Sequence, residues 1–385
     1  MTPAQPVPSE IQLSCQLPDQ EWTLVVLARR TYTVDDAGRL TPARAQPGLR
    51  SAPEWDPALH DLLIADHDLW THKLRTDVIV QGHVYGDGAA TQLLASVGVG
   101  RARKRIQVFG ERRCTLGRTG ELLFSQPTAI ERVPLRYTHA YGGRDATYEK
   151  IHGNPVRADK DFAGMSEQEY DSSSPYLYPR NPCGRGYLIE ATRQAVEALV
   201  LPQLENPDDL LGPRRLAVGR ADQWVRMPLP QGTDWIDYAW YPRIAFLGIV
   251  PTCERFDEPP AEVTLGLVPP ELAAGDGEMP PDTDFEVGNG ASLGLQLPHL
   301  RGGEPVVLDR VHPRIACWRF AVPSAPHLAI GAGGKLTAVE SVLHTMIVEP
   351  DRGQVTVVWR GYGRAKRRYT PDEVAAMPMR ANWTD

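Results

Sequence analysis

Apolar residues at every second position, in short runs bounded by glycine, proline and aspartate, dominate the first 140 residues. Two such runs cover residues 93–99 and 105–109, and a longer apolar run from Trp22 to Val34 is followed by the turn-forming residues 35–38. This period is typical of half-buried strands, and the turn residues set where each strand ends. The pattern predicts a twisted antiparallel sheet or a β-sandwich over this half of the chain.

Glycine and proline are frequent enough to limit element length. The chain has 34 Gly and 35 Pro, which is 34 + 35 = 69 of 385 residues. That share is above the average but too low for a collagen-like or disordered chain, and 42% of the residues are hydrophobic. We therefore expect a mainly β fold: a large twisted antiparallel sheet or β-sandwich-like module with long ordered loops and a few short helices.

The distribution of strand and loop signals predicts one β-rich domain over residues 8–363. It is strand-rich over 15–140, loop-rich over 141–260 and strand-rich again over 261–363. A hairpin is expected where residues 345–348 and 355–359 flank a Pro- and Gly-containing turn, and a strand is expected from the alternation of Leu293, Leu295 and Leu297. Helices are expected over 190–200 and, with a capping box at Thr370, in a basic tail over 364–385.

Charge and cysteine content exclude several classes of protein. With 41 basic and 48 acidic residues the net charge is −7, so no overall positive field supports nucleic-acid binding. No signal peptide and no membrane-spanning apolar run is recognisable, and the five cysteines form no Cys-x-x-Cys motif. We expect a soluble cytoplasmic protein with reduced thiols, no cofactor and no metal; the sequence leaves its oligomeric state open.

One short motif suggests a catalytic alternative. Residues 290–294 match the G-x-S-x-G pattern of a hydrolase nucleophile, with Ser292 at its centre and Asp309 and His312 following in the order that such enzymes use. The motif requires a strand before the serine and a helix after it, whereas an alternating strand-like run follows here. A serine hydrolase therefore stays an alternative and not the main interpretation.

Two other groups of polar residues are better explained by structure than by chemistry. His67, Asp68 and His72 lie close in sequence but not on one face of a regular element, so we expect solvated loop residues and no metal site. The basic runs 101–105, 112–113 and 364–368 are expected to be a charged strand turn and a solvated tail, with a local surface for an anionic partner as the other interpretation.

Aromatic residues in the loop-rich middle are the strongest sign of a binding function. Trp and Tyr anchor protein interfaces, although they also fill the cores of large β proteins. Arg185, among turn formers, either pairs internally or faces a partner, and residues 141–143 indicate a close backbone approach. The candidate partner-binding residues are Tyr141, Arg185, Tyr187, Trp235, Trp240 and Tyr241.

Seven motifs in order resemble a bacterial family, known by an uncharacterised-domain label, whose members accompany type VI secretion effectors. They are KLRTDVIVQG at 73–82, VFGER at 108–112, PLRYTHAYGG at 134–143, NPCGRGY at 181–187, LPQLENP at 201–207, LRGGEPVVL at 300–308 and VWRG at 358–361. The chain departs from the family pattern at Cys183, at Gly303 and over 208–260.

The resemblance implies a non-catalytic adaptor or chaperone that holds a toxic effector in the cytoplasm and helps load it onto the secretion spike. No catalytic residues are carried over from the family. The expected partners are the cognate effector and the spike protein, with no nucleic acid and no membrane. Two alternatives stay open: the serine hydrolase using Ser292, and a β-sandwich that binds a glycan or another ligand through its Tyr- and Trp-rich middle.

Overall fold

A computed structural model of the chain describes residues 8–16, 22–59, 62–152, 176–216, 226–244, 286–332 and 335–383. Parts of the predicted loop-rich middle, namely 153–175, 217–225 and 245–260, lie outside these residues. Within the described residues no helix has the length and apolar character needed to cross a membrane.

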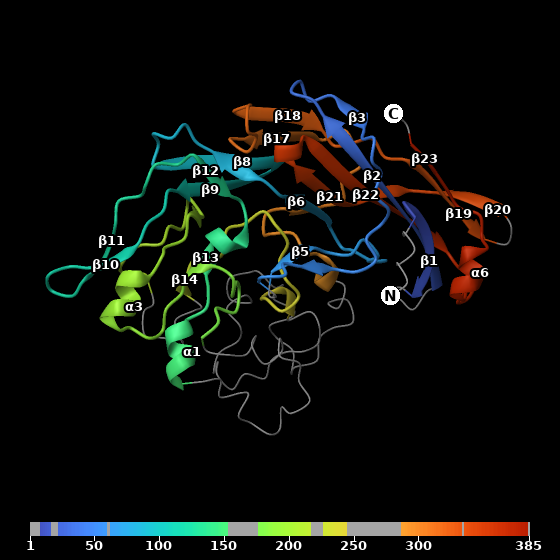
Figure 1. Cartoon of the computed structure of the whole chain (residues 1–385). Helices are drawn as coiled ribbons and strands as arrows, with labels where there is room; N and C mark the ends of the chain where they lie inside the picture. The colour runs from blue at the N-terminus through green and yellow to red at the C-terminus, as the bar shows by residue number, and fades with distance from the viewer. Residues whose placement is uncertain are drawn as a thin grey trace.

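The largest element is a seven-stranded sheet built from both ends of the chain (Figure 1). Its order is β1 (Glu10–Gln16), β2 (Trp22–Val34), β22 (Gln354–Arg364), β21 (Ser341–Glu349), β6 (Thr76–Val80) and β16 (Gln296–Leu297), with β3 (Leu40–Pro42) also paired to β2. The pairs are antiparallel except for β21 with β6.

A second, five-stranded sheet packs against it. Its order is β15 (Leu204–Glu205), β9 (Ala102–Phe109), β8 (Gln92–Val99), β17 (Pro305–Asp309) and β18 (Cys317–Ala321). Leu24 and Trp359 of the large sheet share one buried cluster with Val97, Leu308 and Trp318 of the second. The two sheets thus form a sandwich with a common core, as the alternating sequence pattern predicts.

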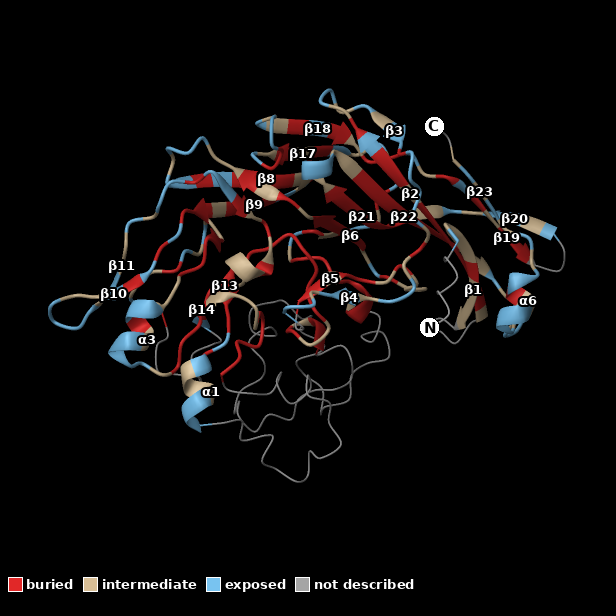
Figure 2. Cartoon of the chain, viewed as in Figure 1, coloured by how far each residue is buried: buried red, intermediate tan, exposed pale blue. Residues whose placement is uncertain are grey.

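Both faces of the large sheet are covered, which explains the continuous apolar run in β2. Leu24, Val26 and Ala28 point into the sandwich core, whereas Val25 and Leu27 point to the opposite face and pack in a separate cluster. A strand buried on both sides needs apolar residues at consecutive positions. Figure 2 shows that the central strands of the large sheet, such as β22 and β21, are buried, whereas α1, α3, α6 and the turn between β10 and β11 are mostly exposed.

Smaller elements surround the sandwich. The strands are β4 (Glu54–Trp55) with β5 (Leu63–Ala65), β7 (His83–Tyr85) with β12 (Arg132–Pro134), β10 (Cys114–Leu116) with β11 (Leu122–Phe124), β13 (Tyr141–Gly142) with β14 (Arg185–Gly186), and β20 (Lys335–Val339) with β19 (His327–Ala332) and β23 (Arg380–Asn382). The helices are α1 (Ala146–His152), α3 (Arg193–Ala198) and α6 (Pro371–Ala375), with 3-10 turns at Tyr137–His139 and Pro350–Arg352.

Most element predictions are confirmed. The fold is mainly β, the hairpin between β21 and β22 forms, and α6 begins with the predicted capping box, in which Thr370 and Glu373 exchange hydrogen bonds. The helix expected over 190–200 is shorter, because the Thr192 side chain caps it at Ala195 and Leu199 is already extended.

Two sequence interpretations need correction. The alternation of Leu293, Leu295 and Leu297 yields only the two-residue strand β16. The basic run 364–368 is mostly exposed, as expected, but the chain beyond it returns as β23 and pairs with β19, so the tail is part of the fold.

Candidate functional site

Five of the six candidate partner-binding side chains lie in the interior. Tyr141, Tyr187, Trp235, Trp240 and Tyr241 are all buried, with Tyr241 the most exposed at 8%. The Trp240 ring packs edge-on against Tyr137 at 5.4 Å between centroids, and the Tyr141 ring packs edge-on against Tyr178 at 5.0 Å. These rings support the loops from inside, and none of the five side chains is exposed in the structure.

Arg185 also acts internally. Its Nε donates to the Thr138 carbonyl oxygen at 2.9 Å, its Nη1 donates to Gln203 Oε1 at 3.2 Å, and its Nη2 lies 3.0 Å from His139 Nε2. The half-buried guanidinium therefore joins β14 to the 3-10 turn before β13 and to the segment before β15. Of the two roles that the sequence left open, the structure shows the internal one.

The expected close backbone approach occurs at Gly142. This residue has φ of +142°, and a Cβ there would lie 2.1 Å from the Asn181 carbonyl oxygen. Asn181 in turn donates from Nδ2 to the carbonyl oxygens of Tyr137 and Tyr141, at 2.8 and 3.0 Å. The two loop motifs around residues 141 and 181 thus lock each other in place.

Ser292 does not have the surroundings of a hydrolase nucleophile. It is fully buried, and within the described residues its Oγ forms no hydrogen bond to an imidazole or a carboxylate and lies beside the Tyr137 hydroxyl. Asp309 instead accepts from Ser96 Oγ at 2.6 Å and pairs with Arg103, while His312 Nδ1 accepts from the backbone N–H groups of residues 314 and 315. The three side chains form no hydrogen-bonded triad.

The polar residues around His67 are not a solvated loop, which corrects that interpretation. Asp68 is buried and pairs with Arg29, and His72 Nδ1 lies 3.1 Å from the Tyr362 hydroxyl. His67 is half-buried and stacks on Trp70. The part of the chain that the structure describes contains no cluster of His, Cys, Asp and Glu able to hold a metal ion.

Asp68 belongs to a buried polar layer on the outer face of the large sheet. Residues that pair directly on neighbouring strands have their side chains on the same face of the sheet. Thr31 of β2 and Thr356 of β22 are such a pair on the outer face, and their hydroxyl groups are hydrogen-bonded at 2.9 Å. The polar layer consists of Arg29, Arg360 and Asp77 from the sheet, and Asp66, Asp68, Lys73 and Arg243 from the segments that cover it.

Three ion pairs stabilise the polar layer. Lys73 Nζ lies 2.6 Å from Asp77 Oδ2 and donates to Thr345 Oγ1, and Arg243 Nη2 lies 2.5 Å from Asp66 Oδ2. Arg29 and Asp68 form the third pair. Burial favours the neutral form of Asp66, but Arg243 and Lys73 outweigh it and hold the pKa of this carboxyl below its ordinary value.

Arg360 is the one member of the polar layer without an ion-pair partner. Its Nη2 donates to the Lys73 carbonyl oxygen at 3.1 Å and lies 3.4 Å from His299 Nε2, but its Nε and Nη1 have no hydrogen-bond partner among the described residues. Burial lowers the pKa of its guanidinium, which nonetheless stays charged at neutral pH. The layer thus holds four cations and three carboxylates, all of them buried.

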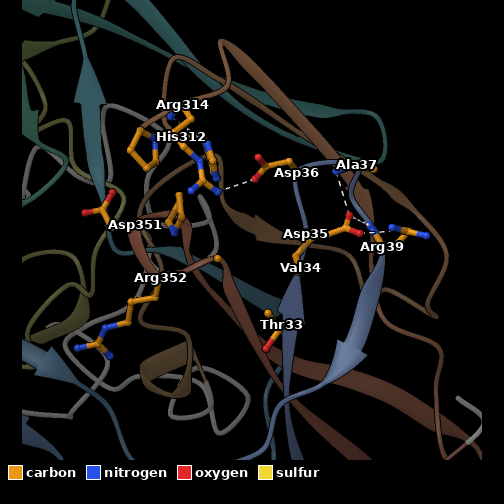
Figure 3. Close-up of a pocket in the computed structure, with 13 residues that line it drawn as sticks. Thr33, Val34, Asp35, Asp36, Ala37, Arg39, His312, Arg314, Asp351 and Arg352 are labelled. Atoms are coloured by element: carbon orange, nitrogen blue, oxygen red, sulfur yellow. Dashed lines mark hydrogen bonds and ion pairs between the residues drawn. The ribbon is translucent and has the colours of Figure 1, made fainter.

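A surface pocket of about 610 Å³ lies at one end of the sandwich (Figure 3). Three turns form it: residues 35–39 between β2 and β3, residues 312–314 between β17 and β18, and residues 350–353 between β21 and β22. Its charged side chains come from all three turns and are evenly divided in sign: Asp35, Asp36 and Asp351 against Arg39, Arg314 and Arg352.

Hydrogen bonds hold the three turns of this pocket together. Val34 N donates to the Gly353 carbonyl oxygen at 2.8 Å, and Trp318 Nε1 donates to the Asp35 carbonyl oxygen at 3.2 Å. Asp351 accepts from His83 Nδ1 at 2.6 Å and from the Tyr85 hydroxyl at 2.8 Å. The turns are therefore fixed by backbone and side-chain contacts.

Several charged side chains of the pocket nevertheless extend into solvent. The Arg314–Asp36 pair, 2.7 Å apart, leaves these side chains 72% and 61% exposed, and the Arg39 side chain is 82% exposed. Figure 3 shows Arg314 and Asp36 linked across the pocket between two turns. The arrangement presents charges of both signs on a rigid frame, which suits recognition of another protein's charged side chains.

Sequence reasoning missed both the polar layer and this pocket. The sequence did contain one indication of the layer: the KLRTD motif carries Lys73 and Asp77, which form one of its ion pairs. The pocket joins turns almost 320 residues apart, such as those at Asp35 and Gly353, and only the strand pairing brings them together. Arg112 and Lys104, in basic runs interpreted as exposed, are buried.

Comparison with known families gives one match. The family described as "Uncharacterized protein conserved in bacteria (DUF2169)" matches residues 19–360 of the chain. This range covers the whole second sheet, the large sheet except β1 and the last four residues of β22, and all seven motifs except one residue of the last. Neither a curated protein nor a solved structure matches the chain.

Proposed function

Because the chain belongs to DUF2169, a family of uncharacterised bacterial proteins, we propose that it is a non-catalytic adaptor. It binds a type VI secretion effector in the cytoplasm and helps load it onto the secretion spike. The partners are suggested by the family that the seven motifs resemble, since its members accompany such effectors.

The pocket of Figure 3 is the observation that carries the proposal. Its turns are held by long strands, so docking on them requires little additional ordering of the adaptor. Its exposed side chains carry charges of both signs. Such a surface favours a partner with the complementary arrangement of charges over other charged proteins, so it supports specificity more than affinity.

The two alternative functions receive less support. A hydrolase would need an accessible Ser292 bonded to an imidazole, whereas this hydroxyl is buried and no imidazole among the described residues is bonded to it. A glycan site would need exposed Trp or Tyr rings, but no Trp or Tyr lines the pocket of Figure 3.

The first experiment is co-purification of the protein with the effector encoded beside its gene. We expect a stable complex, and we expect deletion of the adaptor gene to abolish secretion of that effector. If the two purified proteins form no complex and secretion continues without the adaptor, the proposed function is wrong.

A charge-swap variant tests the pocket itself. In the double variant Asp36→Arg/Arg314→Asp the internal ion pair is retained while the two displayed charges exchange places. We expect an unchanged unfolding midpoint and at least about tenfold weaker effector binding by calorimetry.

The matched control is the exchange Arg301→Glu/Glu340→Arg, at an exposed ion pair away from the pocket residues, which should leave the affinity unchanged. Equal affinities for the wild type and the Asp36/Arg314 swap would show that the effector docks elsewhere.

A further inference from the structure

The polar layer contains one more buried cation than buried carboxylates. Arg29, Lys73 and Arg243 each face an aspartate, and the pairs use all three carboxylates of the layer. Arg360 is 1% exposed, and in the part of the chain that the structure describes two of its three nitrogens have no hydrogen-bond partner. A buried charge is normally paired, because removing it from water without a counter-charge is strongly unfavourable.

The polar neighbours of Arg360 do not supply a negative charge. His299, beside its Nη2, has its pKa lowered to about 4, mainly by burial and then by Arg360 itself, so it is neutral at pH 7. Burial also holds the pKa of Cys15 above its ordinary value, which keeps this thiol protonated. The counter-charge is therefore absent from the described surroundings of this guanidinium.

Half-buried residues lie next to Arg360 on the outer face of the sheet. The Tyr362 ring lies over the guanidinium, 4.5 Å from Cζ to the ring centroid, and its hydroxyl contacts His72. Both of these residues are half-buried. Half-buried apolar side chains of β1 and of the covering segment surround them: Leu13, Cys15 and Leu69. We call these five residues the Arg360 patch.

We propose that the Arg360 patch receives an apolar segment of the bound effector, with one Asp or Glu of that segment pairing with Arg360. The carboxylate reaches Nε and Nη1 when the Tyr362 ring turns away from the guanidinium. A bidentate carboxylate is a stronger partner for arginine than an aromatic ring, and Leu13 and Leu69 provide apolar contacts beside it. The identity of the partner rests on the proposed function, whereas the missing counter-charge does not.

The proposal predicts opposite effects of one substitution on stability and on binding. In Arg360→Met the uncompensated charge is removed and the stem of the side chain is retained, so the free protein should unfold at a higher urea concentration than the wild type. The same variant should bind the effector about thirtyfold more weakly or worse, because the effector carboxylate would be buried without a partner. A variant that only damaged the fold would lose both properties.

Matched variants separate this prediction from general charge effects. Arg29→Met removes a buried arginine that has a carboxylate partner and should lower the urea midpoint. Arg118→Met removes an exposed arginine from the turn between β10 and β11 and should change neither property.

The outcomes are distinguishable from those of the proposed function. If the wild type binds the effector and Arg360→Met binds equally well, the inference is wrong and the adaptor function stands. If Arg360→Met unfolds at a lower urea concentration than the wild type, the guanidinium is already compensated and the inference is also wrong. If the wild type binds no effector, the adaptor function fails, and so does the identity proposed for the partner.

Discussion

At the scale of single residues, the charged and glycine positions of the motifs serve the architecture. Asp77 accepts from Lys73, from Asn289 Nδ2 at 3.0 Å and from the backbone N–H of Gly290 at 2.9 Å. One carboxylate thus joins β6 to the segment before β16. Lys73 and Asp77 of the motif are therefore buried and hold neighbouring segments in place. Their charge alone would suggest exposed residues.

Gly142 provides a sharp test of the locked loops. Gly142→Ala introduces a Cβ where the Asn181 carbonyl oxygen stands 2.1 Å away and where φ is +142°, so both contact and backbone conformation oppose it. We expect the free energy of unfolding to fall by about 3 kcal/mol in urea titrations.

The control for this substitution is Gly120→Ala, which also has positive φ but meets no atom within 4 Å. It should lower the free energy of unfolding by about 1 kcal/mol. If the two variants lost equal stability, the contact with Asn181 would have no effect of its own.

Sequence reasoning identified this close approach but could not tell that the aromatic side chains beside it are buried. Paired glycines after a bulky residue indicate a backbone conformation or a close approach of another segment that other residues do not allow. A Trp or Tyr in an irregular stretch serves equally well as an anchor outside or a support inside, and Trp235 and Trp240 are supports. The direction of a loop side chain depends on contacts far away in sequence, so the pattern alone could not decide.

At the scale of elements, period-two patterns located β8 and β9 well but not every side chain on them. Lys104, within a run of arginines, was interpreted as part of an exposed turn. It lies in β9, opposite Val97, and its Nζ donates to the Leu293 carbonyl oxygen at 2.8 Å. The alternation of β9 predicts that position 104 faces inward. The exposed arginines on either side make the whole run look like a charged surface segment in the sequence.

The buried amine of Lys104 predicts an unusual pH dependence. Burial lowers its pKa from 10.5 to about 8, which corresponds to about 3 kcal/mol lost from stability at neutral pH. Since the unfolded chain holds this proton up to pH 10.5, stability from this residue rises as pH increases from 8 to 10.5. Lys104→Met removes this cost of about 3 kcal/mol but leaves the Leu293 carbonyl oxygen without its hydrogen bond, which costs about 1 kcal/mol. The variant should therefore raise the free energy of unfolding at pH 7 by about 2 kcal/mol.

This gain should shrink towards zero at about pH 10, as urea titrations at the two pH values would show. The control Lys366→Met, at an exposed position, should have no pH-dependent effect on stability. A gain for Lys104→Met that was the same at both pH values would contradict the burial of a charged amine.

At the scale of the whole molecule, one buried and two half-buried histidines predict acid sensitivity. Burial lowers the pKa of His139 and His299 to about 4, and it holds that of His344 well below 6.5. In the unfolded chain these rings bind protons below pH 6.5, whereas in the folded protein they do not. Stability should therefore be complete above pH 6.5 and decrease as the pH falls from 6.5 towards 4.

Urea titrations between about pH 7 and pH 5 measure this decrease directly. His299→Gln, which keeps a polar side chain without a titrating ring, should reduce the slope. A free energy of unfolding that stayed constant down to pH 5 would show that the rings are protonated in the folded protein as well.

The pairing of β2 with β22 has a consequence for how the protein is made. Thr23 pairs with Arg364 and Thr33 with Gln354, so a strand that leaves the ribosome early waits for one synthesised more than 300 residues later. Until then the apolar run of β2 has no neighbour on that edge, and pairing over such a separation is slow. Folding of the sandwich is thus completed after translation, and a nascent chain halted before residue 354 would depend on chaperones to avoid aggregation.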